Sequence, residues 1–382
     1  MYAFSFCNPT RIEFGEDKEQ HIGEYMQAFG VKKALLVYGS NRIKQSGLFD
    51  TVSGSLKVQG IDFVELGGIK SNPVFSKVEE GITLAKSSGA DCILSVGGGS
   101  CLDSAKAIAA GAKYTGNLWN CFLNKTPMTE ALPIFDIMTL AATGSEMNGG
   151  CVITNEAMLQ KYSLYGAALY PKVSVINPKL QATVSRDYLV YSASDVIAHS
   201  IEGYFTAKVQ PEIINLQVEA NIKTIIKTTE LLLANPDDTE ARGDFAWAAT
   251  MALNGLTHVG TFGLSFPNHM IEHAMGAVCD VPHGAGLSVV MPAWMTWFKE
   301  RNRPQFERFA KEIFGLNTAE EGIAALKAWF DKIGTPTSLA QLNISGSVLE
   351  QVIDTAAKDA VYKQLDDVYT REAIAEIFAL AK

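Results

Sequence analysis

Two hydrophobic periodicities divide the chain near its midpoint. In the first half, short apolar runs alternate with segments whose apolar residues recur every three to four positions. The runs predict buried strands, and the segments between them predict helices. The expected strands are residues 34–38, 62–66, 92–96, 133–138, 150–154 and 173–176, and the expected helices are residues 16–29, 46–58, 75–88 and 101–112.

After Asn177-Pro178 the strand pattern stops and a helical pattern continues to the C-terminus. Ser185 is a good N-cap for the first of these helices. Because helices separate the earlier strands, we expect parallel βαβ units. The fold class predicted is an α/β domain with a Rossmann-like parallel sheet over residues 1–183, followed by an all-α domain over residues 184–382. The later helices are expected near residues 187–207, 213–233, 239–256, 267–278, 285–299, 304–313, 318–331, 347–359 and 368–380.

Four of the six histidines form a pattern in the second half. Residues four apart on a helix project from the same face, so each i,i+4 pair can direct two donors at one point. Such a pair on a solvated face would have no special role, but the first pair lies in a largely apolar helix, where a buried acid and imidazole require a partner. A divalent Zn or Fe ion suits these donors. The pattern comprises Asp195 with His199, His269 with His273, and His283; His21 and His258 lie outside it and are expected to be structural.

Gly97-Gly98-Gly99-Ser100 follows the expected strand at 92–96 and begins a helix. Glycines let the backbone approach a pyrophosphate, and the N-terminus of a helix offers free N–H groups to it. The segment lacks the full G-x-G-x-x-G pattern, so a simple tight turn is the alternative. A second loop, residues 139–146, supplies hydroxyls at the same edge of the sheet, which favours a nucleotide site.

Two further features bear on the cofactor. Asp103 is predicted either to face the cofactor as a catalytic residue or to be an acid of the first helical turn. The loop after the first expected strand, residues 38–44, contains no acid that would select NAD, so NADP(H) is favoured over NAD(H). Arg42 and Lys44 in this loop either contact the cofactor or are solvated.

The composition is that of an ordinary soluble protein, with 47% hydrophobic and 19% charged residues. A net charge of −9 and the absence of a basic run argue against nucleic-acid binding. The six cysteines show no C-x-x-C spacing, which is typical of reduced thiols. We find no secretory leader and no apolar run long enough for a membrane helix, and therefore expect a cytoplasmic protein without membrane association.

These motifs together resemble the iron-containing (group III) alcohol dehydrogenases. The resemblance spans nearly the whole chain and is strongest to the butanol dehydrogenase and NADPH-dependent aldehyde reductase branch. It rests on Gly-Gly-Ile-Lys-Ser-Asn-Pro at 67–73, GGGSxxDxxK at 97–106, ATGSE at 142–146, and the histidine segments that end in Pro282-His283-Gly284.

The resemblance implies a dehydroquinate-synthase-like fold, a homo-oligomer of two or more subunits, and one Fe(II) or Zn ion held by Asp195, His199, His269 and His283. It implies that His273 lies near the nicotinamide as a non-ligand, and we interpret it as a proton relay. The cofactor positions it implies are Gly39, Ser40, Asn72, Gly97, Gly98, Gly99, Ser100, Asp103, Thr139, Thr143, Lys161 and Leu180.

The predicted reaction is hydride transfer between NAD(P)H and a small aldehyde or primary alcohol. One alternative is a non-redox, metal- and nucleotide-dependent lyase of the dehydroquinate synthase type, which would need basic residues around an anionic substrate. Another is a nucleotide-binding protein without turnover, which a complete metal site argues against. An apolar substrate is favoured by residues 247–253 and by Phe262, Phe266 and Trp294, unless these aromatic residues belong to the core.

Overall fold

The computed structural model describes all 382 residues and divides them into two compact units. The sheet unit comprises residues 7–157 and 162–184. The helical unit comprises residues 1–6, 158–161 and 185–382. The N-terminal segment and the short segment that contains Lys161 therefore group with the helical unit.

The sheet unit is built on six parallel strands in the order β1-β8-β5-β4-β2-β3. The strands β2, β4, β5 and β8 are almost entirely buried, which explains their continuous apolar runs. β6 and β7 form a separate two-stranded sheet. The strands are β1 (Arg11–Phe14), β2 (Lys33–Tyr38), β3 (Asp62–Leu66), β4 (Cys92–Gly98), β5 (Ile134–Leu140), β6 (Gly150–Asn155), β7 (Gln160–Tyr165) and β8 (Val173–Ile176).

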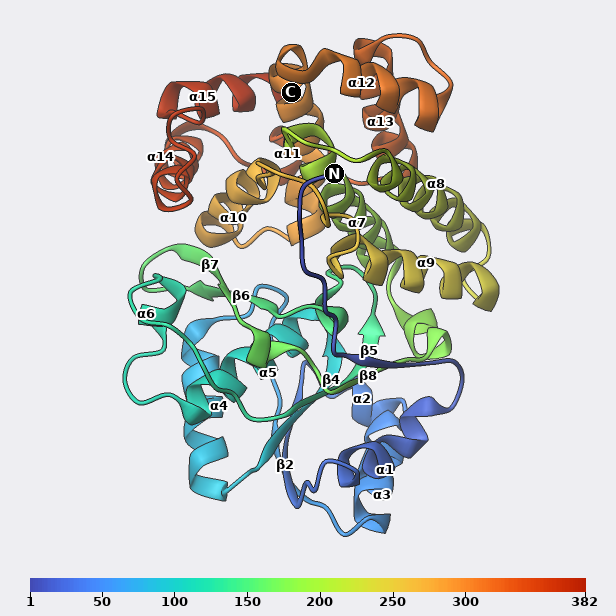
Figure 1. Ribbon diagram of the computed structural model, residues 1–382, viewed down its shortest axis with the longest axis vertical. Helices are drawn as coiled ribbons and strands as arrows, with labels where there is room; N and C mark the ends of the chain where they lie inside the picture. The colour runs from blue at the N-terminus through green and yellow to red at the C-terminus, as the bar shows by residue number, and fades with distance from the viewer. The chain divides into compact units, whose positions relative to one another are not determined.

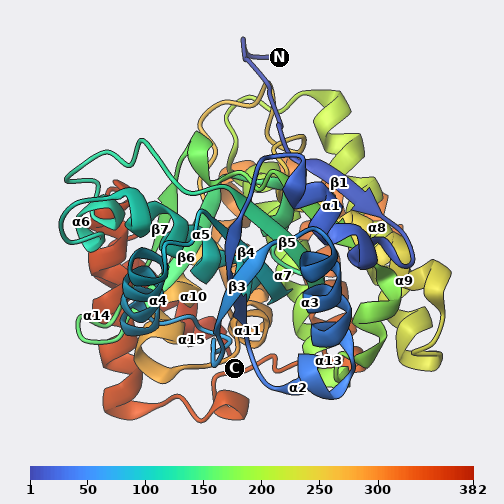
Figure 2. The ribbon, with the colours of Figure 1, turned by 90° about the horizontal axis from the view of Figure 1, so that it is seen from below.

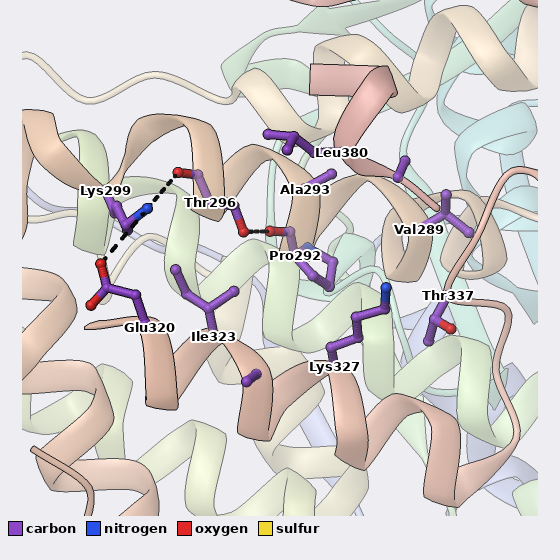
Figure 3. Close-up of a pocket in the computed structure, with 12 residues that line it drawn as sticks. Val289, Pro292, Ala293, Thr296, Lys299, Glu320, Ile323, Lys327, Thr337 and Leu380 are labelled. Atoms are coloured by element: carbon purple, nitrogen blue, oxygen red, sulfur yellow. Dashed lines mark hydrogen bonds and ion pairs between the residues drawn. The ribbon is translucent and has the colours of Figure 1, made fainter. Parts of the chain in front are cut away.

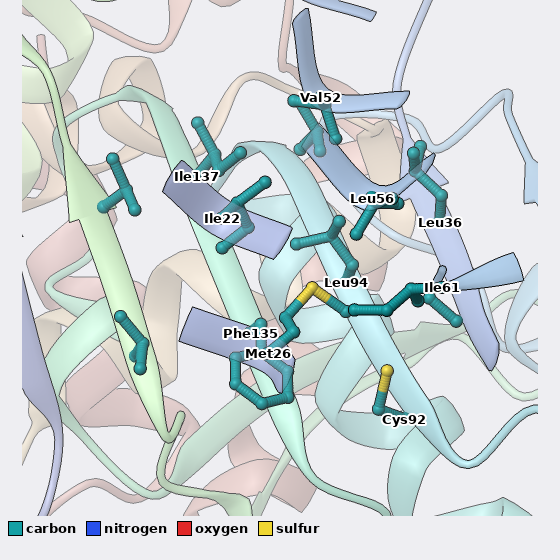
Figure 4. Close-up of a cluster of buried hydrophobic side chains, with 14 of the residues drawn as sticks. Ile22, Met26, Leu36, Val52, Leu56, Ile61, Cys92, Leu94, Phe135 and Ile137 are labelled. Carbon is teal, nitrogen blue, oxygen red and sulfur yellow. The ribbon is translucent and has the colours of Figure 1, made fainter. Parts of the chain in front are cut away.

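Helices cover both faces of the six-stranded sheet, with α1 (Ile22–Gln27) and α3 (Leu48–Val58) on one side and α4 (Phe75–Ser88) and α5 (Gly99–Lys113) on the other (Figure 2). The core on the first side joins α1 and α3 to apolar residues of the strands (Figure 4). Its members include Ile22, Met26, Val52, Leu56, Leu36, Leu94 and Ile137, each fully buried. This packing holds β2 and β4 in place, so that the loops at their carboxyl ends have a fixed support.

The helical unit packs its main helices around α7 and α11 (Figure 1). α7 contacts α8, α9 and α11, and α11 also contacts α10, α13 and α15. No helix combines the length and apolar character needed to cross a membrane. The helices are α7 (Arg186–Thr206), α8 (Glu212–Ala234), α9 (Thr239–Leu253), α10 (Pro267–Cys279), α11 (His283–Phe298), α12 (Arg303–Phe309), α13 (Ala319–Ile333), α14 (Gly346–Tyr362) and α15 (Arg371–Leu380).

The predicted fold class, a parallel sheet with helices followed by a mostly helical C-terminal part, is confirmed. Each helix expected after residue 185 is present within a few residues of its predicted bounds. The sequence patterns did not predict β1, β7 or the short helices α2 (Arg42–Gln45) and α6 (Trp119–Phe122). The helix expected at 16–29 is divided into a 3-10 turn, Lys18–His21, and α1.

Candidate metal centre and nucleotide site

Three helices of the helical unit bring together the four residues expected to bind metal. α7 carries Asp195 and His199 one turn apart, α10 carries His269, and α11 begins at His283. Asp195 Oδ1 lies 3.7 Å from His199 Nδ1, 3.5 Å from His269 Nε2 and 3.4 Å from His283 Nε2. The carboxylate oxygen is therefore a common neighbour of three imidazole nitrogens.

Ser185 fixes where α7 begins, and Gly284 lets α11 approach α7 closely. Ser185 accepts a hydrogen bond from the backbone N–H of Tyr188 and so begins α7. Gly284, directly after His283, packs against the same helix: a Cβ at Gly284 would lie 2.0 Å from the Tyr191 carbonyl oxygen. Only glycine permits this approach, which brings the start of α11 close to the turn of α7 that ends at Asp195.

The unsatisfied atoms of the cluster fit a metal ion. Asp195 Oδ1, His199 Nδ1 and His269 Nε2 are all buried and have no hydrogen-bond partner. Such atoms cost free energy in a protein interior unless a partner satisfies them. One cation would satisfy all three, and a donor set of imidazole nitrogens and a carboxylate oxygen suits Fe(II) or Zn.

The charge states also favour a cation at this point. Burial alone would raise the pKa of Asp195, but the imidazoles of His199, His283 and His269 outweigh it and hold that pKa well below the ordinary value. Burial lowers the pKa of His199 to about 3. For His269, burial is outweighed by the nearby carboxylates of Asp195 and Glu202, which raise its pKa to about 9. Without a metal the cluster thus holds an ionised carboxylate beside a protonated His269, and a metal ion bound by His269 would displace that proton.

Two buried glutamates, which the sequence patterns did not identify, support the histidines from behind. Glu202 Oε1 accepts hydrogen bonds from Nδ1 and from the backbone N–H of His269, each at 2.9 Å. Glu272 Oε2 is hydrogen-bonded to His283 Nδ1. A proton on Nδ1 leaves the Nε2 lone pair free to bind metal, as in other carboxylate–histidine–metal arrangements. The feature that could have identified them is a charged residue at a fully buried position of an apolar helix.

Lys161 and His273 lie beside this cluster. The Lys161 ammonium is 3.2 Å from Glu272 Oε2 and 3.3 Å from His283 Nδ1. The ring centroid of His273 is 5.6 Å from that of His283 and 6.2 Å from that of His269. Burial, with added repulsion from Lys161 and His283, lowers the pKa of His273 well below its ordinary value. His273 is therefore a neutral imidazole at pH 7.

The aromatic residues that the sequence suggested for a substrate pocket lie in different environments. Trp294 is fully buried and donates a hydrogen bond to the Tyr369 hydroxyl at 3.0 Å, as a core residue does. Trp247 and Phe262 are exposed. Phe266 has its ring centroid 5.9 Å from that of His269. Phe266 is thus the aromatic residue that we associate with the metal cluster.

The glycine-rich loop forms the junction of β4 and α5 in the sheet unit. Gly97 and Gly98 end the strand, and Gly99 and Ser100 begin the helix. No side chain caps the start of α5, so its first N–H groups are free for a phosphate. A Cβ at Gly97 would lie 2.4 Å from the sulfur of Cys101, and a Cβ at Gly99 would lie 2.4 Å from the hydroxyl of Thr143. The second loop, which follows Thr139 at the end of β5, therefore packs directly against the first.

Asp103 and Lys106 hold that second loop. Asp103 accepts hydrogen bonds from the Ser145 hydroxyl at 2.7 Å and from the Val152 N–H at 2.9 Å. The fully buried Lys106 donates to the carbonyls of Ser145 at 2.7 Å and Gly150 at 2.8 Å. Since α5 begins at Gly99, Asp103 lies in the second helical turn and not in the first. These contacts give both side chains a part in shaping the nucleotide loop.

The loop after β2 borders a hollow at the carboxyl edge of the sheet. This hollow has a volume of about 460 Å³ and is lined by Tyr38, Gly39, Ser40, Asn41, Gly67, Gly68 and Ile69. The basic residues of the loop are not simply solvated: Arg42 donates to the Thr183 carbonyl, and the Lys44 ammonium lies 2.6 Å from Glu65 Oε2. Asn72 is buried, and Leu180 packs partly buried against the sheet core.

A separate groove of about 280 Å³ lies in the helical unit between α11, α13 and the C-terminal residues (Figure 3). Its two lysines already have anionic or carbonyl partners: Lys299 lies 3.8 Å from Glu320, and Lys327 donates to the Lys382 carbonyl at 2.8 Å. The groove contains none of the candidate metal ligands.

Comparison with known proteins identifies relatives over the full length. A family model described as iron-containing alcohol dehydrogenase matches residues 9–178, and the C-terminal model of the Fe-containing family matches residues 189–381. The chain is 32% identical to NADH-dependent butanol dehydrogenase A of Clostridium acetobutylicum, over 94% of each chain. It is 30% identical to the NADPH-dependent aldehyde reductase YqhD of Escherichia coli, over 92% of each chain. The crystal structure of NADH-dependent butanol dehydrogenase A from Thermotoga maritima matches with a TM-score of 0.96 and 45% identity, covering 100% of this chain and 99% of the other.

Proposed function

Because the chain belongs to the iron-containing alcohol dehydrogenase family, we propose that Asp195, His199, His269 and His283 hold one divalent ion, Fe(II) or Zn. The protein is an alcohol dehydrogenase or aldehyde reductase that uses a nicotinamide cofactor, and the comparisons give no support to a lyase. The observation that carries the metal assignment is the convergence of three buried, unpartnered ligand atoms.

The two bound groups have complementary parts in the reaction. When bound, the nicotinamide supplies or accepts the hydride, and the divalent ion supplies Lewis acidity toward the carbonyl or alcohol oxygen. The chain's own residues orient and hold these groups. Gly97, Gly98, Gly99 and Ser100 at the start of α5 bind the pyrophosphate, and Asp103 fixes the adjoining loop by its contacts to Ser145 and Val152.

The remaining cofactor contacts follow the edge of the sheet. Gly39 and Ser40 border the hollow that suits the adenosine end of the cofactor. Thr143 packs on Gly99, and Thr139 lies at the end of the neighbouring strand. We assign Asn72, Lys161 and Leu180 to cofactor contacts on the family pattern. The substrate class is a small aldehyde or primary alcohol, in keeping with the names of the relatives.

His273 is assigned the proton relay. Its lowered pKa keeps the imidazole neutral at pH 7, so that one ring nitrogen can accept a proton while the N–H of the other donates one, in either direction of the reaction. In a His273→Ala variant, kcat should fall and its pH profile should change. His21→Ala, at an exposed position outside the cluster, is the control. Full activity of His273→Ala across the pH range would remove this residue from the relay.

For the cofactor we propose a preference for NADPH, which favours aldehyde reduction as the working direction. Residues 39–44 contain no acid that would repel the 2′-phosphate. Glu65 is bound by Lys44 at 2.6 Å and by the Tyr38 hydroxyl at 3.0 Å, so its charge is compensated. NADH is the second candidate, because the butanol dehydrogenases of Clostridium and Thermotoga are named NADH-dependent.

Gly39→Asp tests this preference. A Cβ at Gly39 would lie 3.4 Å from the Ile69 carbonyl oxygen and 3.7 Å from the Cys101 sulfur, which are ordinary contact distances. The new carboxylate should lower kcat/KM for NADPH by at least about tenfold through charge repulsion, and leave NADH little changed. Gly39→Asn, which has the same size without the charge, is the matched control. Equal losses in the two variants would contradict the electrostatic explanation.

The activity itself is tested on protein stripped of metal and reconstituted separately with Fe(II) and Zn. Consumption of NADPH and of NADH with butyraldehyde is followed by the absorbance of the reduced nicotinamide. We expect turnover only in the reconstituted protein, and loss of metal binding in Asp195→Asn. Metal-independent turnover, or an Asp195→Asn variant that binds metal as the unmodified chain does, would overturn the assignment of the ligands.

A further inference from the structure

A buried ion pair lies behind His283, on the side away from the proposed metal position. The Glu272 side chain is fully buried, the Lys161 side chain is 5% exposed, and their Oε2 and Nζ atoms are 3.2 Å apart. Burying two charges is costly unless their geometry and hydrogen bonds compensate the lost hydration. The pair therefore needs an explanation beyond the stability of the fold.

The contacts of Glu272 concentrate on one oxygen. Oε2 is hydrogen-bonded to His283 Nδ1 and also contacts the Lys161 ammonium, whereas Oε1 is buried without a partner. An ammonium can only donate, so the 3.3 Å contact between Lys161 Nζ and His283 Nδ1 joins two donors that share Oε2. His283 is thereby held with its proton on Nδ1 and with Nε2 directed toward Asp195 Oδ1, 3.4 Å away.

Two glycines make the space for this pair. A Cβ at Gly286 on α11 would lie 2.8 Å from Glu272 Cγ. A Cβ at Gly276 on α10 would lie 2.9 Å from the Lys161 ammonium. Both distances are shorter than the non-bonded contacts that Cβ atoms make in proteins. Any larger residue at either position would therefore displace one member of the pair.

The corresponding support of His269 is built differently. Glu202 accepts from the backbone N–H of His269 and from the side-chain amide of Asn268, in addition to His269 Nδ1. Two amide N–H groups thus help to orient Glu202, whereas the Lys161 ammonium orients Glu272. A cation is also what the neighbouring groups would otherwise attract, since Glu272, His273 and His283 have ligand atoms within 4.8 Å of one another.

We propose that Glu272 is a positioning residue that fixes His283 as a metal ligand, and that Lys161 is the counter-ion that prevents a second metal ion from binding at Glu272. This inference rests on the proposed metal site. Removal of the two members of this ion pair should therefore change metal binding in opposite directions. A purely structural ion pair would give losses in both cases.

The test measures metal binding and not activity, so that any effect of Lys161 on the cofactor does not interfere. Metal-free protein is titrated with Co(II), and the visible absorption bands give the stoichiometry and the coordination. Competition with a chelator gives the Kd for Zn. Glu272→Gln, which keeps an acceptor and loses the charge, should raise this Kd by about 10–100-fold and alter the Co(II) bands. Gly286→Ala should have the same effect by displacing Glu272.

Lys161→Met should instead lower the Kd or add a second equivalent of Co(II), and Lys161→Arg should restore the single tight site. Glu219→Gln is the matched control, since Glu219 is a buried glutamate of the same unit that binds Tyr204 and Arg308 and is expected to leave metal binding unchanged. Glu272→Gln with unchanged Kd and bands, or Lys161→Met with a single site of unchanged or weaker affinity, would overturn the inference. Failure of the unmodified chain to bind Co(II) would instead overturn the metal site on which it rests.

Discussion

A single methyl group at Gly284 should disturb the metal centre without removing a ligand. The Cβ of Gly284→Ala would lie 2.0 Å from the Tyr191 carbonyl oxygen, whereas a Cβ essentially never comes within 3.0 Å of a heavy atom of a non-neighbouring residue. The first turn of α11 must therefore move from α7 by roughly 1 Å, because both partners are backbone and neither can rotate away. His283 is the adjacent residue, so it moves with that turn.

The magnitude follows from the tolerance of metal ligands. Ligand distances in metal sites vary by only about 0.2 Å, so a displacement of His283 by several times this amount weakens its bond. We expect the Kd for Zn to rise at least about tenfold, which is about 1.4 kcal/mol. Overpacking should lower the stability of the metal-free protein by about 1–3 kcal/mol, less a gain of up to about 1 kcal/mol from replacing glycine in a helix.

The assay compares chelator-competition titrations and urea unfolding of Gly284→Ala with those of Gly54→Ala. Gly54 lies in α3 and a Cβ there would meet nothing within 4 Å, so this control should be slightly more stable and bind metal normally. If Gly284→Ala binds Zn as tightly as the unmodified chain, the contact between α7 and α11 does not set the position of His283, and the argument fails.

Three further changes test other parts of the structure. Removing the metal with a chelator should lower the unfolding temperature. The folded state should lose about 4 kcal/mol of stabilisation if the free metal concentration had been 1,000 times its Kd. An unchanged unfolding temperature would contradict tight metal binding to the folded state. Burial lowers the pKa of His258 from 6.5 to about 4, so its contribution to stability is complete above pH 6.5 and is lost as the pH falls toward 4. The loss is at most about 3 kcal/mol, and urea unfolding at pH 7 and 4.5 should show a smaller difference for His258→Phe than for the unmodified chain. Lys106→Met should cost about 3–5 kcal/mol in urea unfolding, because it removes a buried ammonium that donates to the carbonyls of Ser145, Asn148 and Gly150, and should weaken nucleotide binding measured by calorimetry.

The elements that sequence patterns predicted are those whose environment is uniform along their length. β4 is buried on both faces and reads as a continuous apolar run, and the long helices after Ser185 repeat their apolar positions over many turns. β1 was missed because it is a four-residue edge strand with both ends exposed. β7 mixes polar and apolar residues without a regular period and lies in a two-stranded sheet, so its sequence carries little strand signal.

In the candidate site too, the sequence predicts what one helix determines alone and misses what depends on contacts between elements. Asp195 and His199 could be paired from the sequence because the helix alone determines that residues four apart share a face. Glu202 and Glu272 could not be assigned, because each acts on an imidazole whose direction depends on the packing of one helix on another. Asp103 could be recognised as important but not as a contact of Ser145 and Val152, which follow it by more than forty residues.

Charge balance connects the proposed metal ligands with the glutamates and the lysine that support them. In the proposed metal centre the histidines would bind as neutral imidazoles, so the carboxylates of Asp195, Glu202 and Glu272 and the ammonium of Lys161 would leave two net negative charges. A divalent cation neutralises these charges, and uncompensated charge in a buried site is costly. A trivalent ion would leave one positive charge unbalanced, so the supporting carboxylates and their single lysine favour the divalent state of whichever metal the histidines bind.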